Sequence, residues 1–440
     1  MINTQWTTCG RKLLKDGHSF FVRGVNYAPT PIGKPGRLDM LGEPSIFLRD
    51  LQNLRAMHAN AVKTYDFYSS VDHSKYLDAA YNGGVDPIFT VFSIWIDQSL
   101  MDPRTRISSD EFQAMITNYR EMAELTGGHP GVMGYSIGGE MNSITVVHDQ
   151  SFWDKFAALT QAVHQGLATH GNAHKIITTT FVDDGGASFR AGEKFGADVD
   201  MWGSNVYQRD YPGSVIPTYM RVPSTKPLLV SEYGYPYASN IEEGRLEELE
   251  MVGKLLLNQA VQMEENYNMT DELREQILVG GFVFEYSDEW WKSGDVGKHN
   301  LGQVRNIGFP LGYLAEEYFG LYKAVKAEED ETNILHPRPT VDLLTNLWAK
   351  GKIGGEGMAF TDCSVKSLPF QQMHATPLVS TSSAWLEPIL FVIVFCAFVF
   401  VAFSLYLTNS RRAHYRRLSP LFKSPRLKSA KRMDDEESFV

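Results

Sequence analysis

The feature that most constrains the fold is the alternation of short β-type runs with longer amphipathic segments through the first two thirds of the chain. Eight runs rich in β-branched and aromatic residues occur at 20–27, 60–65, 86–92, 131–137, 175–181, 200–207, 227–234 and 278–286. Between them lie segments with apolar residues at three- and four-residue spacing, such as 45–59, 109–127, 152–171 and 247–267. Eight such units predict an α/β fold, a (β/α)8 TIM barrel that occupies residues 1–350.

The main alternative is an open, doubly wound sheet. Such a sheet usually binds a nucleotide through a glycine-rich turn after its first strand. No GxGxxG or P-loop sequence follows any of the eight runs, so the barrel is favoured.

A second strong feature is the uncharged apolar run at residues 388–407. Twenty such residues are long enough to cross a hydrocarbon core of ~30 Å as a helix, which predicts a transmembrane helix at 385–407. Only a short basic tail, 408–440, follows, and its arginines are typical of a cytoplasmic flank. The Gly-, Ser- and Thr-rich segment 351–384 is typical of a stalk. The sequence thus predicts a single-pass plasma-membrane protein with an extracellular barrel and a cytoplasmic C-terminus.

An extracellular barrel raises two questions about the ends of that domain. The first 21 residues contain no apolar signal-peptide core, so either the N-terminus of this sequence is incomplete or the C-terminal helix alone directs insertion. Because Cys396 lies in the apolar run, Cys9 and Cys363 are the only candidates for a disulfide; two unpaired thiols are the alternative.

Charge excludes one class of partner. The chain has a net charge of −11, but the segment 408–440 holds nine Lys and Arg against four Asp and Glu, which leaves −16 for the remainder. An acidic body argues against nucleic acid as a partner. His170 and His174 have four-residue spacing, but the intervening Gly-Asn breaks a helix and no acidic ligand accompanies them, so we expect no metal and no cofactor.

Two glutamates stand where a barrel places its chemistry, at the C-terminal ends of strands. Glu140 follows the fourth run and Glu232 lies at the end of the seventh. Retaining glycosidases use such a pair, one as a protonated acid and one as an ionised nucleophile about 5 Å away. We expect Glu140 to be the acid/base and Glu232 the nucleophile, whose charge raises the pKa of Glu140.

Aromatic side chains near the same strand ends favour a carbohydrate cleft, because sugar rings present apolar faces that stack on flat side chains. Eight occur there: Tyr65, Trp95, Trp202, Tyr207, Tyr233, Tyr235, Trp290 and Trp291. The predicted substrate-binding residues are Tyr27, Lys63, Tyr65, Trp95, Asn142, Asn205, Tyr207, Tyr233, Glu285 and Trp290. Tyr207 is positioned to donate to Glu232, whereas Glu285 either binds substrate or is buried against Lys63.

These residues carry a resemblance to clan A glycoside hydrolases and, more narrowly, to the fungal β-1,3-glucanosyltransferases that remodel cell-wall glucan. The matching segments are FFVRGVNYAP, NAVKTYDFYSSVDHSKYLDAA, LLVSEYG and GGFVFEYSDEWW, between Phe20 and Trp291. The resemblance implies a retaining hydrolase or transglycosylase that acts on extracellular or cell-wall β-glucan, with β-1,3 linkages.

The sequence departs from that family at two positions. The family places Asn directly before the acid/base, where it holds the sugar 2-hydroxyl, and this chain has Gly139. Asn142 is a candidate replacement. The family also carries Arg on the second strand, where Lys63 keeps the charge but loses the fork geometry. These departures leave a second hypothesis open, a barrel that binds glycan without turnover.

Overall fold

The computed structural model describes residues 4–360, apart from residues 145 and 172 and the segments 208–214, 269–276, 302–303 and 328–331. The predicted transmembrane helix 385–407, the tail 408–440 and most of the predicted stalk lie outside the described residues. Within the described part of the chain, no helix is both long enough and apolar enough to span a bilayer.

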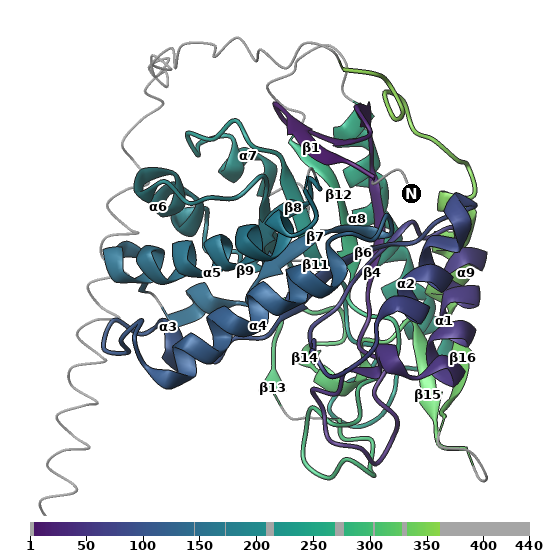
Figure 1. Cartoon of the computed structure of the whole chain (residues 1–440). Coiled ribbons are helices and arrows are strands. Elements are labelled where there is room, and N and C mark those ends of the chain that lie inside the picture. The colour runs from purple at the N-terminus through teal and green to yellow at the C-terminus, as the bar shows by residue number, and fades with distance from the viewer. Residues whose placement is uncertain are drawn as a thin grey trace, which may run out of the picture. The chain divides into compact units, whose positions relative to one another are not determined.

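One parallel sheet forms the barrel seen at the centre of Figure 1. Its strands are β4 (Val22–Asn26), β5 (Ala61–Lys63), β6 (Phe89–Ile94), β7 (Val132–Ile137), β8 (Ile176–Thr179), β9 (Phe181–Val182), β10 (Trp202–Asn205), β11 (Leu228–Tyr233) and β12 (Leu278–Val283). They lie in the order β8-β7-β6-β5-β4-β12-β11-β10-β9. Only Thr180 separates β8 from β9, so these are two parts of one strand. The first part pairs with β7 and the second with β10, which closes the sheet into a barrel. The eight predicted strands and the TIM-barrel fold are confirmed.

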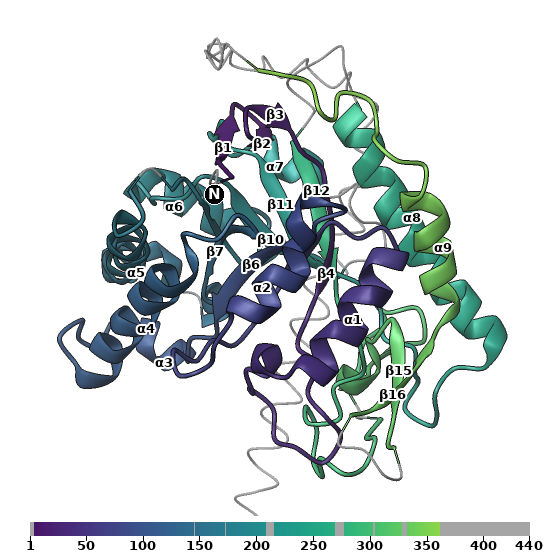
Figure 2. The same ribbon diagram turned by 45° about the vertical axis from the view of Figure 1, so that its right-hand side comes forward.

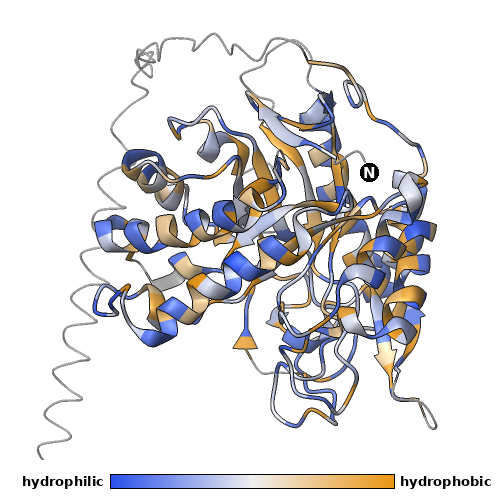
Figure 3. Cartoon of the chain, viewed as in Figure 1, coloured by the Kyte–Doolittle hydropathy of each residue, from blue (hydrophilic) through white to orange (hydrophobic). Residues whose placement is uncertain are grey.

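Helices cover the outside of the barrel. They are α1 (Pro44–Ala56), α2 (Ser74–Tyr81), α3 (Gln98–Met101), α4 (Asp110–Thr126), α5 (Gln150–Ala168), α6 (Ala187–Phe195), α7 (Val215–Tyr219), α8 (Leu246–Asn268) and α9 (Pro339–Trp348). Figure 3 shows apolar residues concentrated on the strands and on the inner helix faces. The caps follow from sequence: the Ser109 side chain accepts a hydrogen bond from Phe112 N, and Asp110 and Glu111 favour the positive end of the α4 dipole.

A small antiparallel sheet closes one end of the barrel. It consists of β1 (Trp6–Cys9), β2 (Lys12–Lys15) and β3 (His18–Ser19), which lie together at the top of Figure 2. Trp6 and Leu13 pack against apolar residues in or next to the barrel strands, including Val22, Ala61, Phe89, Met133, Ile176, Leu229 and Val279. Because most of these residues lie near strand N-termini, this sheet forms the barrel floor, opposite the carboxyl ends.

Residues 351–360 belong to the folded unit, although the sequence analysis assigns them to the stalk. Ala359 forms a β-bridge with His18, and Gly357 N donates to Ser19 O at 2.7 Å. Arg23, buried at the floor, donates to Glu356 Oε2 at 2.9 Å. The folded unit therefore continues past residue 350 through at least residue 360, because Gly-rich composition does not reveal contacts with a sheet far away in sequence. Cys9 is disulfide-bonded, and Cys363 lies outside the described residues.

Long connections surround the opposite end, the barrel mouth. After β12 the chain forms two hairpins, β13 (Val304–Arg305) with β14 (Tyr313–Leu314) and β15 (Tyr322–Val325) with β16 (Ile334–Pro337), at the bottom of Figure 1. Arg338 ties three connections together: Nη1 lies 2.7 Å from Asp288 Oδ1, Nη2 lies 2.8 Å from Glu243 Oε1, and Nη1 donates to Gly320 O. This buried cluster fixes the loops that frame the mouth.

Candidate active site

Glu140 is held at the mouth by a tight turn after β7. Gly138 has φ +65° and Glu140 itself has φ +50°, a left-handed conformation that is uncommon for a residue with a side chain. Glu140 N donates to Thr180 O at 2.7 Å, and Gln98 Nε2 donates to Glu140 O at 3.1 Å. Such strain persists where surrounding contacts enforce it and is common at functional sites. The interruption between β8 and β9 thus leaves a carbonyl that positions Glu140.

Glu232 lies on β11 with its side chain toward the barrel axis and only 6% of its surface exposed. Tyr65 donates to Glu232 Oε1 at 2.7 Å, and Tyr207 donates to Oε2 at 2.6 Å. Lys63 Nζ lies 3.5 Å from Oε1. Two hydroxyl donors and an ammonium group therefore surround a carboxylate that is almost fully buried.

Asn205, at the end of β10, connects Glu140 to the strand that carries Glu232. Its Nδ2 donates to Glu140 Oε1 at 2.9 Å, and its Oδ1 accepts from Ser231 Oγ at 2.8 Å. Ser231 is the neighbour of Glu232 on β11. Because the Ser231 hydroxyl donates to the Asn205 oxygen, the orientation of the Asn205 amide is fixed, and its NH2 group points to Glu140.

The charges of the site act on one another. Burial raises the pKa of Glu140, and the negative charge of Glu232 raises it further, against an opposing hydrogen bond from Asn205. Burial lowers the pKa of Lys63, while Glu232 opposes that change. Burial and Glu232 together raise the pKa of Tyr65 and of Tyr207 well above the usual value, which keeps both phenols as hydrogen-bond donors.

Three predicted substrate-binding residues do not face the site. The Tyr27 hydroxyl donates to Asp50 on α1 at 3.0 Å, and the ring is buried between the barrel and that helix. Tyr233 is also buried, on the outward side of β11, because successive strand residues point to opposite faces. The Asn142 amide donates to Val182 O and Ser188 Oγ, and its oxygen accepts from Val182 N. Asn142 therefore holds the loop, and its amide does not replace the missing Asn at position 139.

Trp202 and Tyr235 also lie away from the mouth. Trp202 packs among aromatic rings beneath α6, and its Nε1 donates to Glu193 at 2.8 Å. Tyr235 accepts a hydrogen bond from Gln259 on α8. Their positions in the sequence are near the strand ends, but their side chains serve the contact between barrel and helices.

Glu285 and Trp290 occupy the rim after β12. Glu285 is 1% exposed, and its pKa lies well above the usual value because of burial and the neighbouring Glu289. Lys63 is paired with Glu232, and no hydrogen bond or ion pair joins it to Glu285 within the described residues. Trp290 is half-buried and stacks on His299, with ring centroids 4.6 Å apart.

Two charged residues near the mouth, Lys292 and Arg37, are not among the residues predicted from the sequence. Lys292 Nζ lies 2.8 Å from Glu289 Oε2 and 4.3 Å from the Phe284 ring centroid. The guanidinium of Arg37 lies 3.7 Å from the centroid of Trp95. The position of Lys292 directly after two tryptophans could have indicated that it lies near the mouth. Arg37 lies in an irregular loop, where no sequence pattern indicates the position of a side chain.

Position 139 is open. Among the described residues that are not its chain neighbours, only Trp95, through Cδ1 at 3.6 Å, comes within 4 Å of a Cβ atom placed on Gly139, and Gly139 does not have positive φ. Within the described residues, no group of three or more His, Cys, Asp or Glu side chains is arranged to hold a metal ion.

A TIM barrel that brings glutamates together from its fourth and seventh strands, β7 and β11, defines the class of glycoside-processing barrels that work through paired carboxylates. The family model described as "Glucanosyltransferase", from glycoside hydrolase family 72, matches residues 5–305. The chain belongs to this glucanosyltransferase family.

Two curated relatives are 1,3-beta-glucanosyltransferases. GAS5 of Saccharomyces cerevisiae is 24% identical over 288 residues, which cover 62% of this chain and 54% of the relative. The gas5 protein of Schizosaccharomyces pombe is 22% identical over 289 residues, which cover 61% of this chain and 51% of the relative. The match thus spans about half the length of these relatives.

Solved structures share the fold at low sequence identity. A mutant of Saccharomyces cerevisiae Gas2p in complex with laminaritetraose and laminaripentaose has a TM-score of 0.54 and 16% identity, covering 81% of this chain and 69% of that chain. A beta-galacturonidase from Eisenbergiella tayi has the same TM-score at 13% identity, covering 80% and 55%.

Proposed function

We propose that the protein is a retaining glucanosyltransferase that cleaves β-1,3-glucan and transfers the released glycosyl unit to another glucan chain. The proposal is supported by the opposite environments of the two glutamates. Glu232 receives two hydroxyl donors and faces an ammonium group, which stabilises an ionised nucleophile. Glu140 has a raised pKa, which suits an acid that must hold its proton.

The mechanism has two displacements. Glu232 attacks the anomeric carbon, the bond to the leaving oxygen breaks, and the proton of Glu140 goes to that oxygen. Glu140, now ionised, then takes the proton of an incoming hydroxyl group as that oxygen attacks the anomeric carbon and releases Glu232. Asn205 keeps the Glu140 carboxyl in position for both steps.

The substrate assignment rests on family membership and on the printed names of relatives, which are 1,3-beta-glucanosyltransferases. Incubation with linear laminari-oligosaccharides, followed by mass spectrometry, tests it. We expect products both shorter and longer than the starting chain. Shorter products alone would indicate hydrolysis, and no product from any β-1,3-glucan would refute the proposal.

Gly139 favours one alternative, a barrel that binds glucan without turnover. The discriminating measurement is oligosaccharide binding by the wild-type protein and the Glu232→Gln variant, alongside turnover. Equal, tight binding by both proteins without any product would support the binding module and contradict the transferase.

We further propose that residues 385–407 span the plasma membrane and place the barrel outside the cell. The support is the uncharged apolar run and the nine basic residues that follow it, whose transfer across a bilayer is strongly disfavoured. Protease added to intact cells should remove the barrel and leave a membrane fragment with the basic tail. Protection of the barrel in sealed cells would overturn this orientation.

A further inference from the structure

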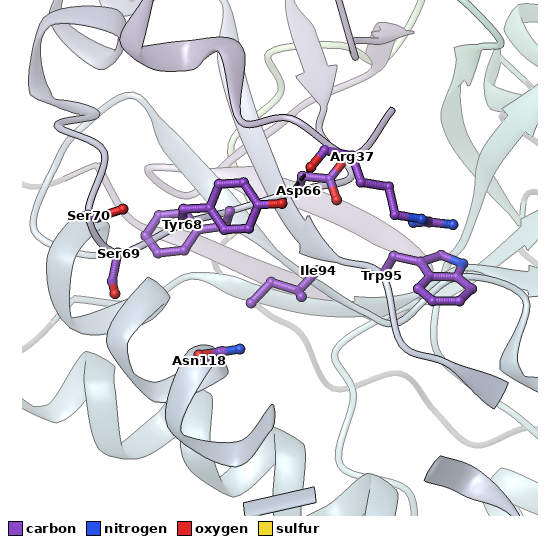
Figure 4. Close-up of a pocket in the computed structure, with 9 residues that line it drawn as sticks. Arg37, Asp66, Tyr68, Ser69, Ser70, Ile94, Trp95 and Asn118 are labelled. Atoms are coloured by element: carbon purple, nitrogen blue, oxygen red, sulfur yellow. Dashed lines mark hydrogen bonds between the residues drawn. The ribbon is translucent and has the colours of Figure 1, made fainter. Parts of the chain in front are cut away.

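A hollow of about 320 Å³ lies beside the catalytic mouth. Figure 4 shows its walls: Arg37 from the loop after β4, Asp66 and Tyr68 from the loop after β5, Trp95 after β6, and Asn118 on α4. This volume is at the lower end of the roughly 300–1,000 Å³ of small-molecule sites. The hollow therefore suits a short group rather than a threaded polymer.

The walls are built by contacts within the protein. The Asp39 Oδ2 atom accepts a hydrogen bond from Tyr68 N at 2.8 Å and lies 2.8 Å from His73 Nε2. The Tyr68 hydroxyl donates to Arg37 O at 2.5 Å. These contacts join the first and second loops of the mouth, so the hollow exists before any ligand arrives.

Its polar side chains have few partners among the described residues. No hydrogen bond joins the Asp66 carboxyl or the Asn118 amide to another described group, and the Arg37 guanidinium lies over the Trp95 ring and interacts electrostatically with Asp66. Phe67 and Ile94 supply a buried apolar floor. The pKa of Asp66 is raised to about 6. Burial is the main cause, Arg37 opposes it, and the charges of Glu289 and Asp39 add to it. Mixed donors and acceptors around an aromatic ring fit a neutral polyhydroxylated ring better than an anion, which the nearby carboxylates would repel.

Trp95 connects the hollow to the catalytic centre. Its Cδ1 atom lies 3.6 Å from the Cβ position on Gly139, which precedes Glu140, and its backbone N donates to Tyr65 O at 3.0 Å. On the far side, Asn118 belongs to the outer helix α4. A ligand group that enters past Trp95 therefore meets the helix layer after a short distance.

From this placement, and resting on the proposed function, we infer that the hollow is a binding subsite for a terminal β-linked glucosyl group of the substrate. This glucosyl group is either the last residue of a linear glucan chain or a short side branch of the chain. Arg37 and Trp95 form one wall, and Asp66 and Asn118 bind hydroxyl groups.

The test uses Asn118→Ala and the space-filling variant Asn118→Trp in the full chain, with Arg120→Ala on an exposed part of the same helix as the matched control. Each change is combined with Glu232→Gln, and calorimetry measures binding of linear laminarihexaose and of a laminari-oligosaccharide with a single β-1,6-linked glucosyl branch. Loss of one hydrogen bond in Asn118→Ala should raise the dissociation constant roughly three- to tenfold. Asn118→Trp should raise it more, and the control should leave it unchanged.

A loss confined to the branched ligand identifies a branch subsite, and an equal loss for the linear ligand identifies a chain-end subsite. Unchanged affinity of Asn118→Trp for both ligands would overturn the inference. The proposed function is tested separately by turnover in the protein with Glu232 intact. If neither ligand binds the Glu232→Gln protein, the subsite inference fails. If the protein with Glu232 intact turns over substrate but the changes at position 118 do not alter binding, the subsite is rejected and the proposed function stands.

Discussion

At the scale of single residues, Gly139 stands where the family resemblance predicts an Asn that holds the sugar 2-hydroxyl. The described part of the chain leaves room for a side chain there, since Trp95 Cδ1 lies at an ordinary contact distance of 3.6 Å from the Cβ position. We expect Gly139→Asn to increase kcat/KM on laminari-oligosaccharides by roughly tenfold or more, because hydrogen bonds to the sugar 2-hydroxyl belong to a set that contributes several kcal/mol in the transition state. Initial rates measured on one oligosaccharide series would check this.

The matched control is Gly139→Ala, which adds the Cβ atom without the amide. It should leave kcat/KM near the wild-type value. An equal gain in both variants would attribute the effect to reduced backbone freedom, and no gain in Gly139→Asn would mean that the 2-hydroxyl is held by another group.

A second residue-scale prediction concerns the proton on Glu140. Burial and the charge of Glu232 both raise the pKa of Glu140, so its proton is retained to a higher pH than in an ordinary glutamate. Glu232→Gln removes the charge but not the burial. The pKa of Glu140 should therefore fall in that variant yet remain above its usual value.

Carbon-13 NMR titration of labelled glutamate side chains, with Glu140→Gln for assignment, measures this shift directly. The exposed α4 variant Glu111→Gln is the control and should leave the titration in place. A pKa of Glu140 that stays the same or rises in Glu232→Gln would show that the two carboxylates do not interact.

Strand position predicted Glu140 and Glu232, and residue type at the same strand ends predicted Lys63, Tyr65, Asn205 and Tyr207. The errors at Tyr27 and Tyr233 have one cause: proximity to a strand end does not say whether a side chain faces the barrel axis or the helices. Alternation from Glu232 could have excluded Tyr233. The role of Asn142 depends on a contact with Val182, forty residues along the chain, which no local pattern reveals.

At the scale of elements, the mouth depends on the buried cation that joins its loops. Arg338 is 3% exposed and pairs with Asp288 and Glu243. Arg338→Met would leave Asp288 charged and buried, so we expect a loss of roughly 3–5 kcal/mol in the free energy of unfolding. Urea denaturation measures it. Arg245→Met, which breaks an exposed ion pair with Glu248, should cost about 1 kcal/mol or less. Equal losses of stability in the two variants would mean that the buried cluster around Arg338 stabilises the fold no more than an exposed ion pair does.

The barrel elements were predictable because each strand is a short buried run and each long helix has one apolar face. The two hairpins after β12 were not, since their strands have two to four residues and no clear alternation. The break at Thr180 was also invisible in the run 175–181. It arises from a contact across strands, the hydrogen bond of Thr180 O with Glu140 N.

At the scale of the whole molecule, we predict that the folded unit requires residues 351–360. A chain ending at Lys350 loses both Glu356, the close partner of Arg23, and the bridge between Ala359 and His18. Compared with a chain ending at Phe360, its free energy of unfolding should be lower by about 3 kcal/mol or more, since hydrogen bonds to charged groups contribute roughly 1.5–3 kcal/mol each. Both chains lack Cys363, so a disulfide to that residue does not affect the comparison. Equal thermal stability of the two chains would mean that residues 351–360 do not stabilise the folded unit and belong to the stalk.

The attachment of the segment 351–360 to the barrel floor has a mechanical consequence. Phe360 N donates to Gly17 O at the floor sheet, and Glu140 and Glu232 lie at the opposite, carboxyl ends of the strands. A pulling force applied at Phe360 is therefore carried by the floor, through contacts such as that of Arg23 with Glu356, and not by the loops of the mouth. Tension at this end of the described chain would leave the geometry of Glu140 and Glu232 undisturbed.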